Sequence, residues 1–105
     1  MFLILTTKPG FYRTELTAGL QPVEAYDYVF CGAVRARFII AEPGTARRVT
    51  VIDEATPPVV NSVPIKFFPS FPTLEAARKE LRHLVSFGTM QVSLDPVALP
   101  RAVAA

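Results

Sequence analysis

The feature that most constrains the fold is a proline-rich segment at residues 56–72. It holds five of the ten prolines of the chain, interleaved with large apolar residues. Proline lacks the N–H that a helix or strand interior needs, so this segment cannot be a central strand along its whole length. So long a connection within a small domain also needs a physical reason. Two interpretations stay open, a lid with its Phe side chains folded onto the core, or an exposed apolar patch that docks a protein partner or a second copy. The docking residues of the second interpretation are Asn61, Lys66, Phe67 and Phe68.

The strongest strand signal lies at residues 23–42, which are rich in aromatic and β-branched side chains. Gly32 stands in the middle of this stretch. We predict two strands joined by a tight turn at Gly32-Ala33, and a single long strand with a bulge at Gly32 is the alternative. Because residues 47–55 predict a further strand, residues 23–55 are expected to form an antiparallel meander.

One helix is predicted at residues 73–87. Thr73 suits the N-cap, and Gly88 suits the position just after the last turn, where a left-handed backbone is common. Apolar residues recur between them with the helical period of 3.6.

These elements predict an α+β fold. Three more strands complete the set, at residues 1–7, 11–16 and 89–94. We expect a single small domain over residues 1–97, with a mostly antiparallel twisted sheet of about five to six strands and the helix packed on one face. Residues 98–105 are expected to be a frayed tail.

Composition excludes several kinds of site. The chain has 105 residues, half of them apolar, with 11 Lys and Arg, 9 Asp and Glu, one Cys and one His. One Cys rules out an internal disulfide, and one Cys with one His rules out a metal site built from several thiolate or imidazole ligands of one chain. The chain carries no glycine-rich phosphate loop, EF-hand, zinc-protease motif or nucleophile elbow. We therefore predict no metal and no cofactor, assign no catalytic residue, and favour a binding protein over an enzyme.

The compartment follows from the N-terminus and the lone cysteine. Residues 1–7 are apolar but lack a basic region before them and a cleavage site after them. No apolar stretch reaches the roughly 18 residues of a membrane-spanning helix. A lone cysteine is typical of a reducing compartment, so a cytoplasmic protein without a membrane partner is expected.

Three further groups carry side chains that can take part in chemistry. Cys31 lies in an apolar run, so a buried and inert thiol is expected there. His83 is expected to be a cation near the C-terminal end of the helix rather than a general base. Asp53 and Glu54 are neighbours on a strand, so their carboxylates point to opposite faces and are expected to be solvated.

A face rich in Tyr and Arg is the one local arrangement that suggests a ligand. A turn at Gly32-Ala33 places four side chains together on one sheet face: Tyr26, Tyr28, Arg35 and Arg37. Such a face can stack a planar or anionic ligand or an unpaired base, although ordinary cross-strand pairs on a half-wet sheet are the favoured explanation. The same register puts Asp27 on the apolar face, where an unpaired carboxylate is costly. Either Asp27 pairs with an Arg, or the register slips by one residue and the two faces exchange.

The leading hypothesis is a non-catalytic cytoplasmic interaction or accessory module that docks through segment 56–72, with a homodimer as one form of it. The alternative is a small-ligand-binding or small catalytic domain that uses the Tyr/Arg face. The third hypothesis is a weak binder of single-stranded nucleic acid, which a net charge of only +2 disfavours.

Overall fold

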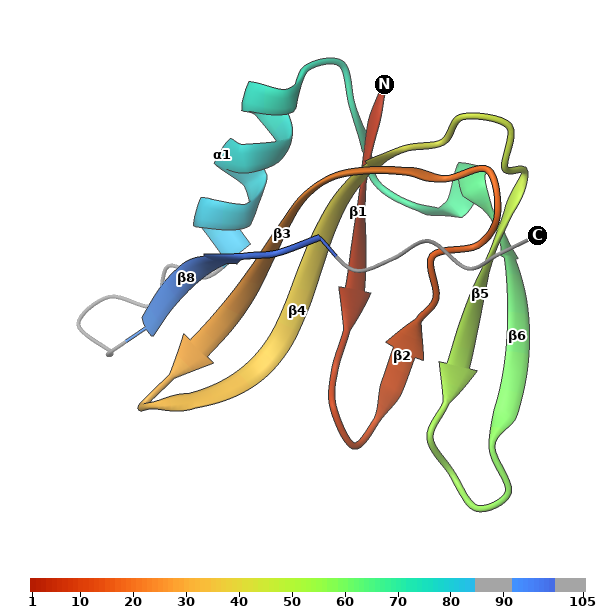
Figure 1. Cartoon of the computed structure of the whole chain (residues 1–105), viewed down its shortest axis with the longest axis horizontal. Coiled ribbons are helices and arrows are strands. Elements are labelled where there is room, and N and C mark those ends of the chain that lie inside the picture. The colour runs from red at the N-terminus through yellow and green to blue at the C-terminus, as the bar shows by residue number, and fades with distance from the viewer. Residues whose placement is uncertain (85–91, 100–105) are drawn as a thin grey trace.

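The computed structural model describes residues 1–84 and 92–99, which fold into two antiparallel sheets and one helix (Figure 1). This confirms the predicted α+β class. The elements follow in the order β1 (Phe2–Thr7), β2 (Tyr12–Thr14), β3 (Gln21–Phe30), β4 (Ala33–Glu42), β5 (Arg48–Asp53), β6 (Val59–Pro64), the 3₁₀ turn η1 (Ile65–Phe67), β7 (Ser70–Phe71), α1 (Leu74–Leu84) and β8 (Val92–Val97).

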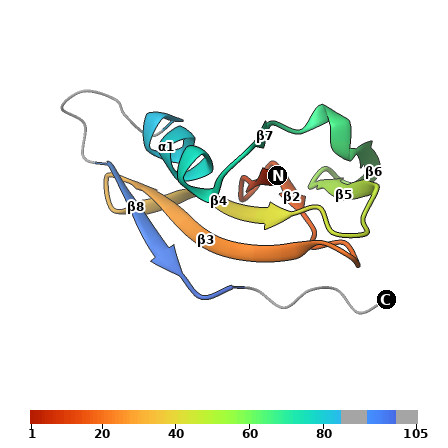
Figure 2. The same cartoon turned by 90° about the horizontal axis from the view of Figure 1, so that it is seen from above.

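The larger sheet has the strand order β7-β1-β4-β3-β8. Strands β3 and β4 form a long curved hairpin, and α1 covers one face of it (Figure 2). Strand β8 runs through Asp95 and Pro96 instead of ending at Leu94 as expected. It lies at the edge of the sheet, where a proline costs no central hydrogen bond. Residues 89–91 of the predicted last strand lie outside the described residues.

The predicted meander over residues 23–55 is correct for the β3–β4 hairpin and wrong beyond it. Strand β5 pairs with β2 and β6 in a second, three-stranded sheet, and the free edge of β4 is taken by β1. The run Leu3-Ile4-Leu5 is buried throughout, so β1 needs a central position with cover on both faces. After β4 the chain turns away at Gly44, where φ is +57° and an added Cβ would lie 2.1 Å from the Gly19 carbonyl oxygen.

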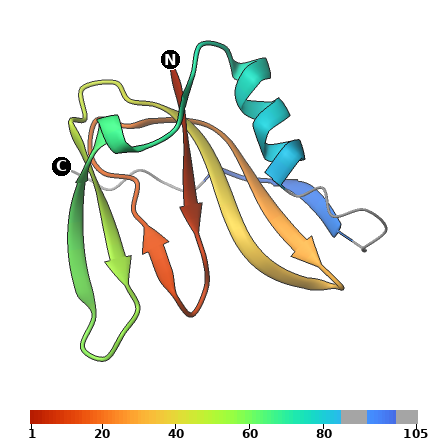
Figure 3. The same ribbon diagram turned by 180° about the vertical axis from the view of Figure 1, so that it is seen from behind.

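Two apolar cores lie on opposite faces of the larger sheet. One packs β1, β3 and β4 against the loop after β2 and against β5 (Figure 3), and its buried members include Leu3, Leu5, Leu16, Leu20 and Val49. The other lies under α1 and includes Ile4, Phe38, Ile40, Ala77 and Leu81. Alternation along β1 therefore sends its side chains into both cores.

The helix begins as predicted. The Thr73 hydroxyl accepts a hydrogen bond from the Ala76 amide (3.1 Å), which is the expected N-cap. The structure describes the helix to Leu84, and residues 85–87 of the predicted helix lie outside the described part. No helix among the described residues is long and apolar enough to cross a bilayer.

An ion pair fastens α1 to β3. The Arg78 guanidinium donates from Nε to a Glu24 carboxylate oxygen (2.8 Å), and the Tyr26 hydroxyl donates to the same carboxylate (2.8 Å). The hydrogen bond from Arg78 lowers the pKa of Glu24, against the opposing effect of burial. Burial, followed by the carboxylate beside it, raises the pKa of Tyr26.

Candidate functional site

The hairpin turn lies one residue earlier than predicted. Its two turn residues are Cys31 and Gly32, with φ of +51° and +79°, and Phe30 faces Ala33. Positive φ at both positions is typical of the type I′ turn, whose twist matches that of the two strands. The predicted pair of strands joined by a tight turn is therefore confirmed, its position is one residue off, and the single-strand alternative is wrong.

A bulge then shifts the register further along the hairpin. Val29 faces Val34 but Tyr28 faces Ala36, so Arg35 is the extra residue on β4. Beyond the bulge Tyr26 faces Phe38.

The Tyr/Arg face does not form. Tyr26 and Tyr28 pack against the core under α1, whereas Arg37 faces Asp27 and binds it with two hydrogen bonds of 2.7 and 3.2 Å. Arg35 lies at the bulge with its guanidinium 6.0 Å from the centroid of the Phe30 ring. The hydrogen bond that Arg37 donates to the Asp27 carboxylate raises the pKa of Arg37. An unpaired Asp27 carboxylate on the apolar face thus indicated a wrong register. In the structure Asp27 pairs with Arg37, so its carboxylate is not left without a partner.

Cys31 is exposed, so the expectation of a buried thiol is wrong. Cys31 lies in the turn between β3 and β4, and its apolar sequence neighbours do not bury it. His83 lies in the last turn of the described helix and is exposed, as expected. Asp53 and Glu54 are exposed as predicted, and the described residues hold no group of three or more metal-binding side chains.

Segment 56–72 combines both of its interpretations. Phe68 and Phe71 are half-buried and pack against the two cores, as a lid would. Phe67 is 70% exposed, and on β6 Val59 and Val60 are 51% and 66% exposed. Asn61 and Lys66 are also exposed. The segment therefore presents an apolar surface along and just after an edge strand.

The prolines of this segment stand where a strand tolerates them. The Ile65 amide donates to the Arg47 carbonyl (3.0 Å), and bonded pairs recur at every second residue of an antiparallel ladder. The β5–β6 register thus directs the backbone groups of the odd-numbered residues of β6 towards β5. The even-numbered positions face outward, and Pro58 and Pro64 occupy two of them, so neither removes a bond to β5.

The outward edge of β6 consequently offers few backbone groups. Its N–H donors are those of Val60 and Ser62, because Pro58 and Pro64 have none. The Ser62 carbonyl already accepts a hydrogen bond from Arg48 (2.8 Å), whose Nε also donates to the Ser62 hydroxyl (2.7 Å). This short edge is the unpaired side of the outer strand of its sheet.

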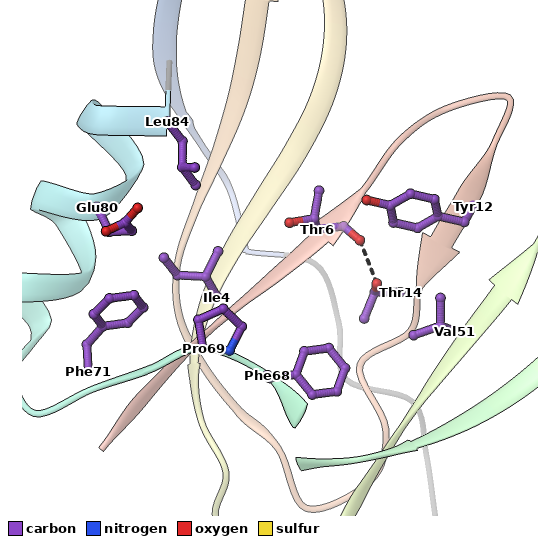
Figure 4. Close-up of a pocket in the computed structure, with 10 residues that line it drawn as sticks. All are labelled: Ile4, Thr6, Tyr12, Thr14, Val51, Phe68, Pro69, Phe71, Glu80 and Leu84. Atoms are coloured by element: carbon purple, nitrogen blue, oxygen red, sulfur yellow. Dashed lines mark hydrogen bonds between the residues drawn. The ribbon is translucent and has the colours of Figure 1, made fainter. Parts of the chain in front are cut away.

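A cleft of about 500 Å³ lies next to this segment (Figure 4). The strands contribute Ile4, Thr6, Tyr12, Thr14 and Val51 to its lining. The segment contributes Phe68, Pro69 and Phe71, and α1 contributes Glu80 and Leu84. Most of this lining is apolar, with hydroxyl groups and one carboxylate among it.

The cleft exists because β1 changes partner along one edge. Phe2 and Leu3 pair with β7, whereas the β2 side is reached only at Lys8, which bridges to Tyr12. Between these two contacts, Thr14 joins the strands through side-chain bonds. Its hydroxyl donates to the Thr6 carbonyl and its amide donates to the Thr7 hydroxyl (2.9 Å).

Sequence reasoning missed this cleft. It assigned a small ligand to the Tyr/Arg face, which shares no residue with the lining of the cleft. The one available signal was Glu80, an acidic residue near the apolar stripe of the helix beside Ala77 and Leu84. Tyr12 and Thr14 carry no local signal.

Comparison with known proteins adds no family to this geometry. No family model, no curated protein and no solved structure matches the chain.

Proposed function

We propose that this chain is a non-catalytic protein-interaction module that docks through segment 56–72 and pairs with a second copy of itself. The observation that carries the proposal is the exposure of Val59, Val60 and Phe67 along one edge strand and the turn after it. Apolar side chains gathered on an accessible strand edge favour pairing with another strand.

The edge of β6 suits a two-fold partner. Its outward residues Val60 and Ser62 lie symmetrically about Asn61, and so do Pro64 at the end of β6 and Pro58, which directly precedes the strand. If two β6 strands run antiparallel with their Asn61 residues opposite, Val60 of each copy faces Ser62 of the other. This arrangement gives four backbone hydrogen bonds between the copies.

Proline also fits this arrangement. Pro58 of one copy faces Pro64 of the other, so no N–H is left without a partner at either end of the pairing. Val59 would face Val63 of the second copy and lose its exposure to water. The Ser62 carbonyl keeps its bond from Arg48, because a carbonyl oxygen has a second lone pair for the partner.

Such a dimer is closed. Pairing consumes the β6 edge in both copies and leaves β2 at the outer ends of a continuous six-stranded sheet, so further chains have no equivalent edge to join. The exposed thiol of Cys31 is compatible with the reducing cytoplasm, which we propose as the compartment.

The two rival functions fare differently. Binding of single-stranded nucleic acid, or of a planar ligand, on a Tyr/Arg face loses its basis because Arg37 lies on the sheet face opposite to Tyr26 and Tyr28. A small-ligand site remains supported by the cleft, which is considered below.

Sedimentation analysis from micromolar to millimolar concentration tests the proposal. Phe67→Ser should weaken the dimer, while Phe11→Ser should leave it unchanged. The two rings are closely matched, since Phe11 is 62% exposed and each ring lies near a lysine, Lys66 at 5.5 Å and Lys8 at 4.7 Å. Phe11 differs in lying on the β1–β2 turn, outside segment 56–72.

The outcomes separate specific docking from general adhesion. Equal effects of the two substitutions indicate non-specific attraction between exposed aromatic rings and contradict the proposal. A wild-type chain that stays monomeric over the whole range contradicts it as well.

A further inference from the structure

The cleft between α1, segment 68–71 and the strands has a sharply uneven polarity. Its two ends differ in Figure 4: Glu80 and Phe71 lie at the helix end, and the hydroxyl-bearing side chains of Thr6 and Tyr12 lie at the other. The walls between them include Ile4 and the other apolar lining residues. A ligand for this cleft therefore has an apolar body.

Among the described residues that line the cleft, Glu80 carries the sole charged side chain. It is partly buried, and none of the ion pairs among residues 1–84 and 92–99 includes it. Glu75, the second acidic residue of α1, does have cationic partners, since it pairs with Arg78 and Arg82. A carboxylate held partly out of water without a cation favours a positively charged ligand group.

Phe71 adds a second feature that favours a cation. Its ring lies beside Glu80 in the cleft, and the same two residues border a neighbouring hollow with Lys79 and His83. The face of an aromatic ring attracts an ammonium group, most strongly where water is partly excluded. Carboxylate and ring together form a place for one ammonium ion.

We propose that the cleft binds a small organic ammonium ion with an aromatic or alkyl body. The ammonium group lies between the Glu80 carboxylate and the Phe71 ring, and the body lies along Ile4, Val51 and Phe68 towards the hydroxyl groups at the far end. A volume of about 500 Å³ is in the range of sites that take small molecules. This site is separate from the β6 edge and does not depend on dimer formation.

The test is titration of the ¹⁵N-labelled full chain with 2-phenylethylammonium, followed by amide chemical shifts. The charge-reversed probe is 3-phenylpropanoate, which has a similar apolar body. We expect shifts clustered at Thr6, Thr14, Val51 and Glu80 with the ammonium probe and weaker binding of the carboxylate probe. Tyramine, which adds a phenolic hydroxyl to the same body, should bind more tightly than 2-phenylethylammonium because the far end of the cleft carries hydroxyl groups.

Two substitutions of Glu80 make the test sharp. Glu80→Gln should weaken 2-phenylethylammonium about tenfold, the usual scale of a lost charge-assisted hydrogen bond. Glu80→Lys should reverse the preference towards 3-phenylpropanoate. Glu42→Gln removes an equal charge from an exposed position outside the cleft and should change nothing.

Several results overturn the proposal. They are equal binding of the ammonium and carboxylate probes, unchanged affinity in Glu80→Gln, and shifts that are absent or fall outside the cleft. A folded spectrum of each variant shows that a loss of binding is local. Val60→Pro alters the β6 edge alone, so this variant should bind 2-phenylethylammonium as the wild type does. A failure of the ammonium site can therefore be told apart from a failure of the dimer.

Discussion

Replacing Val60 by proline tests the docking edge without touching the fold. The N–H of Val60 points away from β5, since the odd-numbered residues of β6 make the bonds to that strand. Proline removes this one donor and keeps an extended backbone at Val59, which is already in a strand. We therefore expect the monomer to keep its stability while the dimer loses affinity.

The magnitude follows from the symmetry of the pairing. Two of the four backbone hydrogen bonds between the copies come from the Val60 N–H, one in each direction. At about 1 kcal/mol net for each bond, Val60→Pro costs the dimer about 2 kcal/mol. This corresponds to a roughly 30-fold rise in the dissociation constant. The Ser62 carbonyl oxygen is not left without a hydrogen bond, because Arg48 still donates to it.

Sedimentation equilibrium measures the dissociation constant, and urea unfolding at low concentration measures the stability of the monomer. Val60→Thr is the matched control, because threonine has nearly the same shape and retains the N–H. We expect its dissociation constant to stay within about threefold of the wild-type value, given the small change in apolar surface. If Val60→Pro and Val60→Thr dimerise equally well, the copies do not pair through β6 and the reasoning fails.

Three further predictions concern the fold that holds these surfaces. Leu81→Ala, in the core under α1, should lower the free energy of unfolding by about 3 kcal/mol, whereas Leu84→Ala, nearly half exposed, should cost under about 1 kcal/mol; urea unfolding compares them. Arg78 lowers the pKa of Glu24 below its ordinary 4.5, so this stabilisation is complete above about pH 4.5 and is lost as pH falls through the folded pKa. Glu24→Gln should accordingly have a lower melting temperature than the wild type at neutral pH and the same melting temperature in strong acid. A difference in melting temperature that persists in acid contradicts this. Cys31→Asn should raise the free energy of unfolding by about 0.5–1 kcal/mol, since Asn tolerates positive φ in a type I′ turn. An unchanged free energy of unfolding would show that the positive φ of Cys31 does not lower the stability.

The candidate site was partly accessible to sequence reasoning. The prolines at residues 56–72 predicted that this segment could not be a central strand, and β6 is an edge strand. The sequence pattern could not predict that the backbone positions of Pro58 and Pro64 point away from β5, because this depends on the register between β5 and β6. The same limit applies to the Phe residues, since exposure of Phe67 and partial burial of Phe68 follow from one η1 turn.

The Tyr/Arg face shows how a small local difference changes a site. The one-residue bulge at Arg35 separates Arg37 from Tyr26, although all of these residues lie on one hairpin as predicted, whereas the earlier turn alone moves each partner by two residues and keeps the faces. The sequence carried a warning in Asp27, whose carboxylate did not fit the apolar face. Strand periodicity is two residues, so the loss of one residue of register exchanges every side chain between faces.

By itself, the sequence determined the α+β class, the capped helix, the β3–β4 hairpin and the exclusion of segment 56–72 from a central strand along its whole length. These depend on local chemistry: the alternation of apolar residues, the cap at Thr73 and the missing N–H of proline. Tertiary structure alone decided that β1 lies between β4 and β7, that β5 leaves the larger sheet, and that the change of partner along β1 opens a cleft beside Glu80. Pairing between strands far apart in the chain depends on which buried surfaces fit together, and no short stretch of sequence contains that information.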